Sequence, residues 1–503
     1  MTAPLREAPL AMDAAQFKAL GHALVDQIAD LLAAVPAGPV TRDCTPSMIR
    51  DALDLSSPLP EQGMDPGELL ARLPGPLFAH SLFNAHPRFF GYITAPPAPI
   101  GVLGDFLASA LNPNVGSWIL GPAATEIEAQ TVRWIAQLIG FPAGDGLLVT
   151  GGNMANIVCL VAARAAAAPW DVRTGGIAAG GGRELVAYAS RETHTWIQKA
   201  ADICGLGTAS IRWIDTTPDL RMDVGALERA VDADVAAGRL PFLVVGTAGS
   251  VSTGAVDPLG DIAAVCRARR IWFHVDGAYG AFAAAVPDAS ADLRALAEAD
   301  SIAVDPHKWL YAPLEAGCAI VRETGALRRA FAYHPPYYRF EEQLLNFVEY
   351  GPQNSRGFRA LKVWLALRQA GASGYRRMIA GDIALSGRLA DAVERHAELE
   401  LLTQSLSITT FRYVPRDMRQ DVAAHDEYLN RLNASLLEAL QHGGQIFVSN
   451  AVIAGRYALR ACIVNFHTRA EDVDAVPPIV AAHGARIDAH MRATISRGDV
   501  TST

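Results

Sequence analysis

The hydrophobic pattern begins with a helical repeat near the N-terminus. Residues 13–35 carry apolar side chains at helical spacing, Asp13 stands at the expected N-cap, and Pro36 follows the last turn. Proline and glycine then punctuate residues 36–76. The first part of the chain, residues 1–85, is therefore predicted to form a helical arm with little core of its own.

Beyond residue 120 the pattern changes to short apolar runs that alternate with helical stretches. Helices are expected over residues 123–139 and 154–168. Strands are expected over residues 146–150, 185–189, 210–214, 242–247, 271–275, 301–304 and 318–321. Most of these runs are apolar on both faces, which is typical of a mostly parallel sheet covered by helices. The pattern predicts an α/β fold with a large domain over residues 86–385.

The last part of the chain alternates helices and strands in a different rhythm. A helix is expected over residues 355–396, and the later elements are strands at 408–413, 445–449 and 457–465 with helices at 425–441 and 471–492. This alternation predicts a small α+β C-terminal domain over residues 386–503.

Composition excludes several classes of protein. Of the 503 residues, 50% are hydrophobic and 19% are charged, which is enough to bury a large core. A net charge of −9 without a dense Lys/Arg tract argues against a nucleic-acid partner. The six cysteines are scattered without a CxxC pair, so neither a disulfide framework nor a metal site is expected. We also expect no signal peptide and no membrane span, and a cytoplasmic location.

Polar residues directly after strands are the candidates for function, because ligands of such sheets bind beyond the carboxyl ends of the strands. After the strand at 146–150 come Gly151, Gly152 and Asn153, at the start of a helix. Glycine lets the backbone approach an anion, and a helix N-terminus offers free N–H groups. The turn is thus a candidate phosphate cradle, with an ordinary strand-to-helix turn as the alternative.

Three further strands lead into residues that suit a cofactor. The flat ring of His194 could stack on an aromatic cofactor, although a lone histidine is more often structural. Thr247 alone indicates only a turn. Asp276 ends an apolar strand, where a buried carboxylate needs a cationic partner such as a pyridinium N–H, unless it is simply a helix N-cap.

The segment SIAVDPHKWLYAP (301–313) carries the strongest signal. Its strand leads directly to Lys308, where desolvation makes a lysine a better imine former. Asp276 precedes Lys308 by 32 residues, one strand–helix–strand unit, so neighbouring strand ends present a carboxylate and an amine to one pocket. Together with a phosphate cradle, these are the three contacts that pyridoxal phosphate needs.

Five motifs sharpen this expectation: HPRFFGY (86–92), PAATEIE (122–128), HVDGAYG (274–280), DPHKW (305–309) and SRGFRALKVW (355–364). With them the chain, from about Ala14 to Val480, resembles the group II pyridoxal-phosphate decarboxylases, which include aromatic L-amino-acid decarboxylase and glutamate decarboxylase. The resemblance implies a large domain of the fold-type I pyridoxal-phosphate transferase kind.

The resemblance also implies the residues that hold pyridoxal 5'-phosphate. Lys308 would carry the cofactor as a Schiff base, Asp276 would pair with the ring nitrogen, and His194 would stack on the ring. The remaining cofactor contacts that it implies are Ala278, Thr247, Gly152, Asn153, Asp305 and His307. Asn153 and Asp305 depart from the residues common in the family, and an acid near a phosphate is unfavourable unless hydrogen bonds or His307 offset its charge.

The substrate side of the site is less regular. The family pattern places Tyr92, Ile93, Gly116, Trp118 and Arg356 near the substrate. The residues at 93 and 116 differ from those of many members, and both changes could enlarge the pocket for a bulky aromatic side chain.

A loop tyrosine completes the implied catalytic set of Lys308, His194 and Asp276. In the segment 331–340 the family's proton donor to the substrate carbon falls on Tyr337, with Tyr333 and Tyr338 as alternatives. Packing against a partner subunit would also explain a tyrosine here.

The implied activity is decarboxylation of an L-amino acid to its amine and CO2. Trp, Phe and Tyr types lead, with acidic or aliphatic amino acids as alternatives. An oxidative aldehyde synthase on the same scaffold is a rival, which the intact His194 and Tyr337 disfavour. A non-catalytic cofactor-binding protein would have lost Lys308 or Asp276, and a Rossmann enzyme would show GxGxxG after an early strand. The family further implies a homodimer with its active site at the interface, which the helical arm would clasp.

Overall fold

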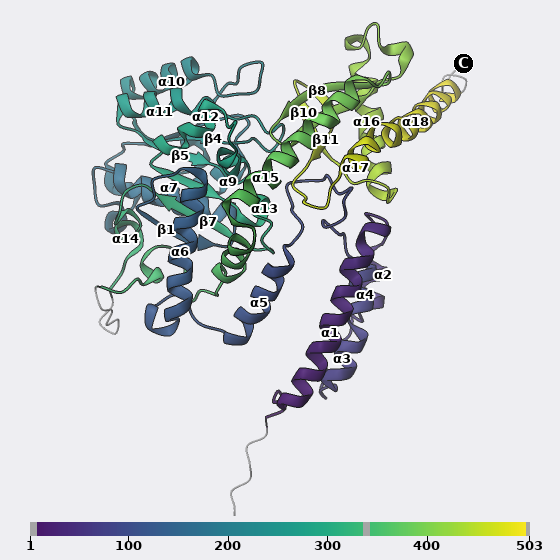
Figure 1. Cartoon of the computed structure of the whole chain (residues 1–503). Helices are drawn as coiled ribbons and strands as arrows, with labels where there is room; N and C mark the ends of the chain where they lie inside the picture. Colours follow the sequence, from purple (N-terminus) through teal and green to yellow (C-terminus); the bar gives the residue numbers. More distant parts are fainter. Residues whose placement is uncertain (1–7, 335–342, 499–503) are drawn as a thin grey trace, which may run out of the picture.

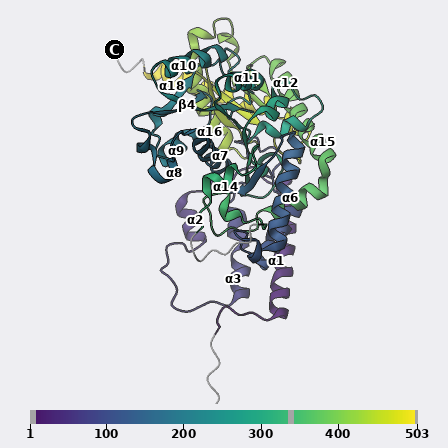
Figure 2. The same cartoon turned by 90° about the vertical axis from the view of Figure 1, so that its left-hand side faces the viewer.

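The computed structural model describes residues 8–334 and 343–498. Within them the chain forms a helical arm, a unit built on a seven-stranded sheet and a smaller unit built on a four-stranded sheet. The arm projects away from the two sheet-containing units in both views (Figure 1 and Figure 2).

The arm consists of α1 (Ala14–Ala34) and three short helices, α2 (Pro46–Ala52), α3 (Pro66–Arg72) and α4 (Pro74–Ala79). Asp13 caps α1 as predicted, because its carboxylate accepts a hydrogen bond from the Gln16 backbone N–H at 2.8 Å. No residue of α1 is buried. The apolar side of this helix is therefore only partly covered in a single chain.

The large sheet has the order β1-β7-β6-β5-β4-β2-β3. Its strands are β1 (Asp145–Val149), β2 (Leu185–Ser190), β3 (Ile211–Ile214), β4 (Leu240–Thr247), β5 (Trp272–Asp276), β6 (Ser301–Val304) and β7 (Gly317–Val321). From β3 through β6 all neighbours are parallel, while β7 runs antiparallel to both β6 and β1. The predicted α/β fold with a mostly parallel sheet is confirmed.

Helices cover both faces of this sheet. Helix α7 (Gly152–Ala167) packs on β4, β6 and β7 on one face. Helix α11 (Leu259–Arg269) packs on β4 and β5 on the opposite face, beside Phe273. Further helices of the unit are α5 (Pro99–Leu111), α6 (Pro122–Ile139), α9 (Trp196–Ile203), α10 (Val224–Ala236) and α14 (Ala326–Phe331). Because both faces are covered, most residues of the strands are apolar.

The smaller unit is an antiparallel sheet with the order β10-β11-β9-β8. Its strands are β8 (Leu399–Ser405), β9 (Ile408–Tyr413), β10 (Ser449–Ile453) and β11 (Arg456–Cys462), and its helices are α16 (Asp426–His442), α17 (Ala470–Asp474) and α18 (Val476–Gly498). Helix α15 (Ala360–Glu394) contacts elements of both units. Figure 1 shows it running from the large sheet to the small one.

Three predictions for this unit were wrong in detail. The strand expected at 445–449 begins only at Ser449, because Ala454 and Gly455 form a two-residue turn with positive φ at both positions, and this turn sets the pairing of β10 with β11. Strand β8 was not predicted. The helix expected at 471–492 is divided into α17 and α18, since Pro477 and Pro478 follow the break and cannot continue a preceding hydrogen-bonded turn.

No helix in the described ranges is long and apolar enough to cross a membrane.

Candidate active site

A cavity of about 460 Å³ lies where β4, β5 and β6 end, beside the first turn of α7. All nine residues expected to contact the cofactor line it: Gly152, Asn153, His194, Thr247, Asp276, Ala278, Asp305, His307 and Lys308. They come from segments far apart in the sequence. Parallel strands bring them together, because their carboxyl ends share one edge of the sheet.

Lys308 lies on a single helical turn, α13 (Pro306–Trp309), directly after β6. Its Nζ is 2.9 Å from Oδ2 of Asp305, while Nε2 of His307 is 3.7 Å from the same oxygen. Burial lowers the pKa of His307, and the nearby Asp305 opposes that shift. The lysine thus faces the cavity with one carboxylate as its counter-ion.

Asp276 is the last residue of β5 and is 7% exposed. Its Oδ2 accepts a hydrogen bond from Nε1 of Trp196 at 2.8 Å, and its Oδ1 accepts one from the Ala278 backbone N–H at 3.2 Å. Among the described residues no cation lies within 4.0 Å of this carboxylate. A buried carboxylate held by neutral donors at a cavity wall is a fitting partner for a cationic ligand group.

The turn between β1 and α7 approaches the lysine segment closely. A Cβ atom on Gly152 would lie 2.7 Å from Oδ2 of Asp305, so only glycine leaves room there. The first backbone N–H groups of α7 lack partners within the helix, and Gly152, Asn153 and Met154 of this first turn line the cavity. This geometry suits an anion such as a phosphate.

His194 and Thr247 complete the walls. Partial burial of the imidazole lowers the pKa of His194, although the residue as a whole is exposed. The negative charge of Asp276 opposes this shift, and the positive charge of Lys308 adds to it. Its Nδ1 accepts a hydrogen bond from the Trp196 backbone N–H at 3.2 Å. Thr247 is buried, and its Oγ1 has no partner in the described part of the chain. Oδ1 of Asp305 is likewise buried and unpartnered there.

The residues expected near the substrate lie elsewhere in a single chain, since the cavity lining contains none of Tyr92, Ile93, Gly116, Trp118 and Arg356. Arg356 is buried in an ion pair with Glu128 and donates to the carbonyl oxygen of Leu148.

Of the three loop tyrosines, Tyr333 is the one within the described residues, and it is not among the residues that line the cavity. Tyr337 and Tyr338 lie outside the described residues. Tyr333 is exposed, and Arg173 lies over its ring.

Several lining residues were missed by sequence reasoning. Glu192, Val251, Leu314 and Glu315 contribute to the walls. The position of Glu192, two residues before His194, was a usable signal. Trp196 does not line the cavity but contacts Asp276, and the sequence did not indicate this contact, because an apolar side chain in a predicted helix is expected to belong to the core.

The groups that line the cavity fit pyridoxal 5'-phosphate. They supply an amine for a carbonyl carbon, a carboxylate for a pyridinium, a helix N-terminus for a phosphate, and a free hydroxyl. No group of three or more potential metal ligands occurs among the residues that the structure describes.

Comparisons with known proteins agree with this chemistry. The model of the pyridoxal-dependent decarboxylase conserved domain matches residues 78–414. An aromatic-L-amino-acid decarboxylase of Bacillus atrophaeus is 33% identical over 92% of this chain and 94% of its own length. A phenylacetaldehyde synthase of Petunia hybrida is 29% identical over 90% of this chain and 91% of its own length.

Solved structures show the same relationship. The crystal structure of TDC from Oryza sativa with PLP and tryptamine has a TM-score of 0.88 and 28% identity, and the match covers 96% of this chain and 100% of that one. The chain belongs to the pyridoxal-dependent decarboxylase family and is a pyridoxal-phosphate-dependent amino-acid decarboxylase.

Proposed function

We propose that this enzyme decarboxylates an aromatic L-amino acid of the Trp, Phe or Tyr type to the corresponding amine and CO2. One observation carries the proposal: nine residues from separate strand ends and turns meet at one cavity around Lys308. The names of similar proteins, which include tyrosine and tryptophan decarboxylases, support the aromatic class.

Several residues of the cavity receive roles in this proposal. Lys308 would bind the carbonyl carbon of the cofactor and would give up that carbon to the substrate amine, and Asp276 would keep the ring nitrogen protonated. His194 would lie against one side of the ring and Ala278 against the other. The first turn of α7, with His307, would hold the phosphate. When bound, pyridoxal 5'-phosphate supplies the electron sink for the bond that breaks as CO2 leaves. Tyr337, which falls at the family's donor position when the residues are counted from Lys308 without gaps, would deliver a proton to Cα, with Tyr333 and Tyr338 as the alternatives.

The charge of the cavity supports a substrate without a side-chain carboxylate. Glu192, Asp276, Asp305 and Glu315 all line it, whereas Lys308 is the one lysine or arginine in the described lining. An acidic side chain would meet like charges there, and like charges in a partly enclosed site repel strongly. A neutral aromatic side chain avoids this cost.

We further propose a homodimer whose interface completes the active site. A groove of about 310 Å³ between α1 and α5 is lined almost entirely by apolar side chains, among them Phe17 and Phe106, whose rings stack 6.5 Å apart. Leu103 and Phe106 are each more than half exposed. A second copy would cover this face, and it would bring residues such as Tyr92 and Trp118 to a cavity they do not reach within one chain.

Sedimentation tests the dimer. Wild type should sediment as a dimer, and Leu103→Glu should shift it toward the monomer with loss of activity. Leu82→Glu, at another exposed leucine outside the groove, is the control. An active, folded wild-type monomer would overturn the dimer.

The domain boundaries and the location are also proposals. We place the arm at residues 1–85, the large domain at 86–385 and the small domain at 386–503. The second boundary falls inside α15, which contacts both sheets. A cytoplasmic location is supported by six cysteines that are all free thiols, four of them buried. Fractionation of cells that express the full chain tests it.

A CO2-release assay across amino acids tests the activity. Purified enzyme with pyridoxal 5'-phosphate should release CO2 and amine from Trp, Phe or Tyr, and little from Glu or Asp. Preferred release from an acidic amino acid would overturn the aromatic class. Aldehyde, ammonia and hydrogen peroxide in place of amine would identify an oxidative aldehyde synthase instead.

A further inference from the structure

Trp196 makes a contact that its position in a helix does not require. The side chain is fully buried at the first turn of α9, and its indole N–H donates to Oδ2 of Asp276 across 80 positions in the sequence. The other carboxylate oxygen of Asp276 is held by the Ala278 backbone. Two fixed donors therefore set the plane of this carboxylate before any ligand arrives.

A second buried residue fixes Trp196 itself. The ring of His274 meets the indole edge-on, with centroids 5.7 Å apart. His274 is fully enclosed, and burial lowers its pKa to about 4, so the ring is neutral at physiological pH. It cannot turn freely, because both of its nitrogens are engaged by Ser301 and Asn156.

The hydrogen bonds around His274 run in one direction. The amide nitrogen of Asn156 donates to the carbonyl oxygen of Gly152, so its Oδ1 faces His274 and accepts from Nε2 at 2.6 Å. Nδ1 of the neutral ring then accepts from the Ser301 hydroxyl at 2.9 Å, and that oxygen accepts from Nε1 of Trp272 at 2.8 Å. This chain locks the wall against which Trp196 packs.

We propose that Trp196 is a positioning residue that aims the Asp276 carboxylate at the ring nitrogen of the cofactor. The indole N–H occupies one lone pair and prevents rotation, so the remaining lone pairs stay directed to the cavity. The inference rests on the role proposed above for Asp276. Trp196 touches neither substrate nor cofactor in this scheme, and acts only through the carboxylate.

The test uses the cofactor and an analogue in which carbon replaces the ring nitrogen. Full-length enzyme should bind pyridoxal 5'-phosphate more tightly than the analogue, because only the natural ring offers Asp276 an N–H. Trp196→Phe keeps an aromatic side chain and removes the donor. Its preference for the natural cofactor, measured as the ratio of the two dissociation constants, should fall roughly tenfold, the loss expected for a hydrogen bond to a charged group.

Trp364→Phe is the matched control. It also removes an indole N–H from a partly buried hydrogen bond, but that bond goes to Oε1 of Gln130 at 2.8 Å, between α15 and α6, and belongs neither to Asp276 nor to the hydrogen bonds around His274. It should leave the preference unchanged, which separates aiming of the carboxylate from general loosening of the core. If Trp196→Phe folds poorly, a benzothienylalanine at position 196, which keeps the two-ring shape without the N–H, gives the same measurement.

The outcomes distinguish a failure of the role proposed for Trp196 from a failure of the role proposed for Asp276. Equal binding of cofactor and analogue by wild type would show that Asp276 does not pair with the ring nitrogen, and both proposals would fall. A wild-type preference that survives undiminished in the variant at position 196 would overturn the role of Trp196 alone. An equal loss in Trp364→Phe would also overturn it, because the effect would then be structural.

Discussion

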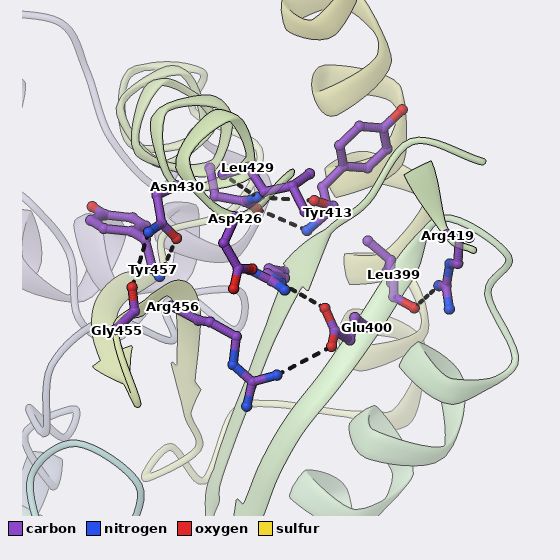
Figure 3. Close-up of polar contacts among 12 residues, drawn as sticks. Leu399, Glu400, Tyr413, Arg419, Asp426, Leu429, Asn430, Gly455, Arg456 and Tyr457 are labelled. Atoms are coloured by element: carbon purple, nitrogen blue, oxygen red, sulfur yellow. Dashed lines mark hydrogen bonds and ion pairs between the residues drawn. The ribbon is translucent and has the colours of Figure 1, made fainter. Parts of the chain in front are cut away.

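The Arg412 cluster of the small C-terminal sheet and the cavity of the large sheet both bury polar side chains, but they satisfy them differently. In the small sheet, the Arg412 side chain is 1% exposed and donates to Glu400 at 2.6 Å and to Asp426 at 2.8 Å. Figure 3 shows Glu400 accepting from Arg456 as well. At the cavity, Thr247 Oγ1 and Asp305 Oδ1 have no partner in the described ranges.

This difference separates polar groups that hold the fold from groups that await a ligand. A satisfied cluster contributes to stability, and removing one member leaves the others buried without a partner. An unsatisfied group at a cavity costs stability in the free protein and gains its partner on binding. Substitutions at the two places should therefore have opposite signatures in stability and in cofactor affinity.

The largest effect is expected at the cavity lysine. Lys308→Ala should abolish the visible absorption of covalently bound cofactor and lower kcat by at least about a thousandfold, because the covalent attachment point is lost. Lys199→Ala, at an exposed lysine on α9, should retain both properties. Undiminished CO2 release by Lys308→Ala would show that this lysine is not required for the reaction.

Arg412→Met should instead act on the fold. The free energy of unfolding should fall by about 2 to 3 kcal/mol, less than for a fully enclosed pair because Glu400 and Asp426 are partly exposed. Denaturant titration measures it, and cofactor affinity should not change. Arg416→Met, at an exposed arginine 3.5 Å from Glu398, should cost no more than about 0.5 kcal/mol. Equal losses in the two variants would contradict the distinction.

A third group lies between these extremes. Asp382 accepts hydrogen bonds from Nε1 of Trp309 at 2.9 Å and from the Tyr311 hydroxyl at 2.8 Å, and both donors lie just after Lys308 in the sequence. Its donors are neutral, and burial raises its pKa to about 7. The folded state thus binds a proton that the unfolded state has released above about pH 4.

The sign of the pH effect follows. The pKa of Asp382 is higher in the folded state than in the unfolded state, so the free energy of unfolding of wild type should decrease as the pH rises from about 4 to about 7. This decrease should be larger than the decrease in Asp382→Asn, by on the order of 1 to 2 kcal/mol. Denaturant titrations of both proteins across this window measure the difference. Asp202→Asn, at an exposed residue, should follow wild type. Parallel curves for wild type and Asp382→Asn would refute the assignment.

The smallest effect is expected at the unpartnered hydroxyl. Thr247→Val should not lower the stability of the cofactor-free protein, because no hydrogen bond is lost and a buried unpaired hydroxyl is removed, while cofactor affinity falls several-fold. Thr253→Val should show the opposite pattern, because the Thr253 hydroxyl forms a hydrogen bond with the Ser250 hydroxyl at 3.0 Å. It should cost about 1 kcal/mol of stability without changing affinity. Calorimetry with and without cofactor distinguishes the two.

The sequence alone determined the α/β fold and the cluster of candidate cofactor residues. Apolar runs of strand length predicted the large sheet, and the rule that ligands bind beyond strand ends selected His194, Asp276 and Lys308. This worked because strand direction and strand ends are local properties, and a parallel sheet converts them into spatial neighbours.

Only the tertiary structure decided which groups pair across the fold. The hydrogen bond from Trp196 to Asp276 joins residues 80 positions apart, and the ion pair of Arg356 with Glu128 joins residues 228 apart. Neither pairing can be predicted from hydrophobic periodicity, because each pairing depends on how the helices pack on the sheet. The β10–β11 register likewise follows from the left-handed turn at Ala454 and Gly455. Local pattern fixes what an element is, whereas packing fixes which side chains it meets.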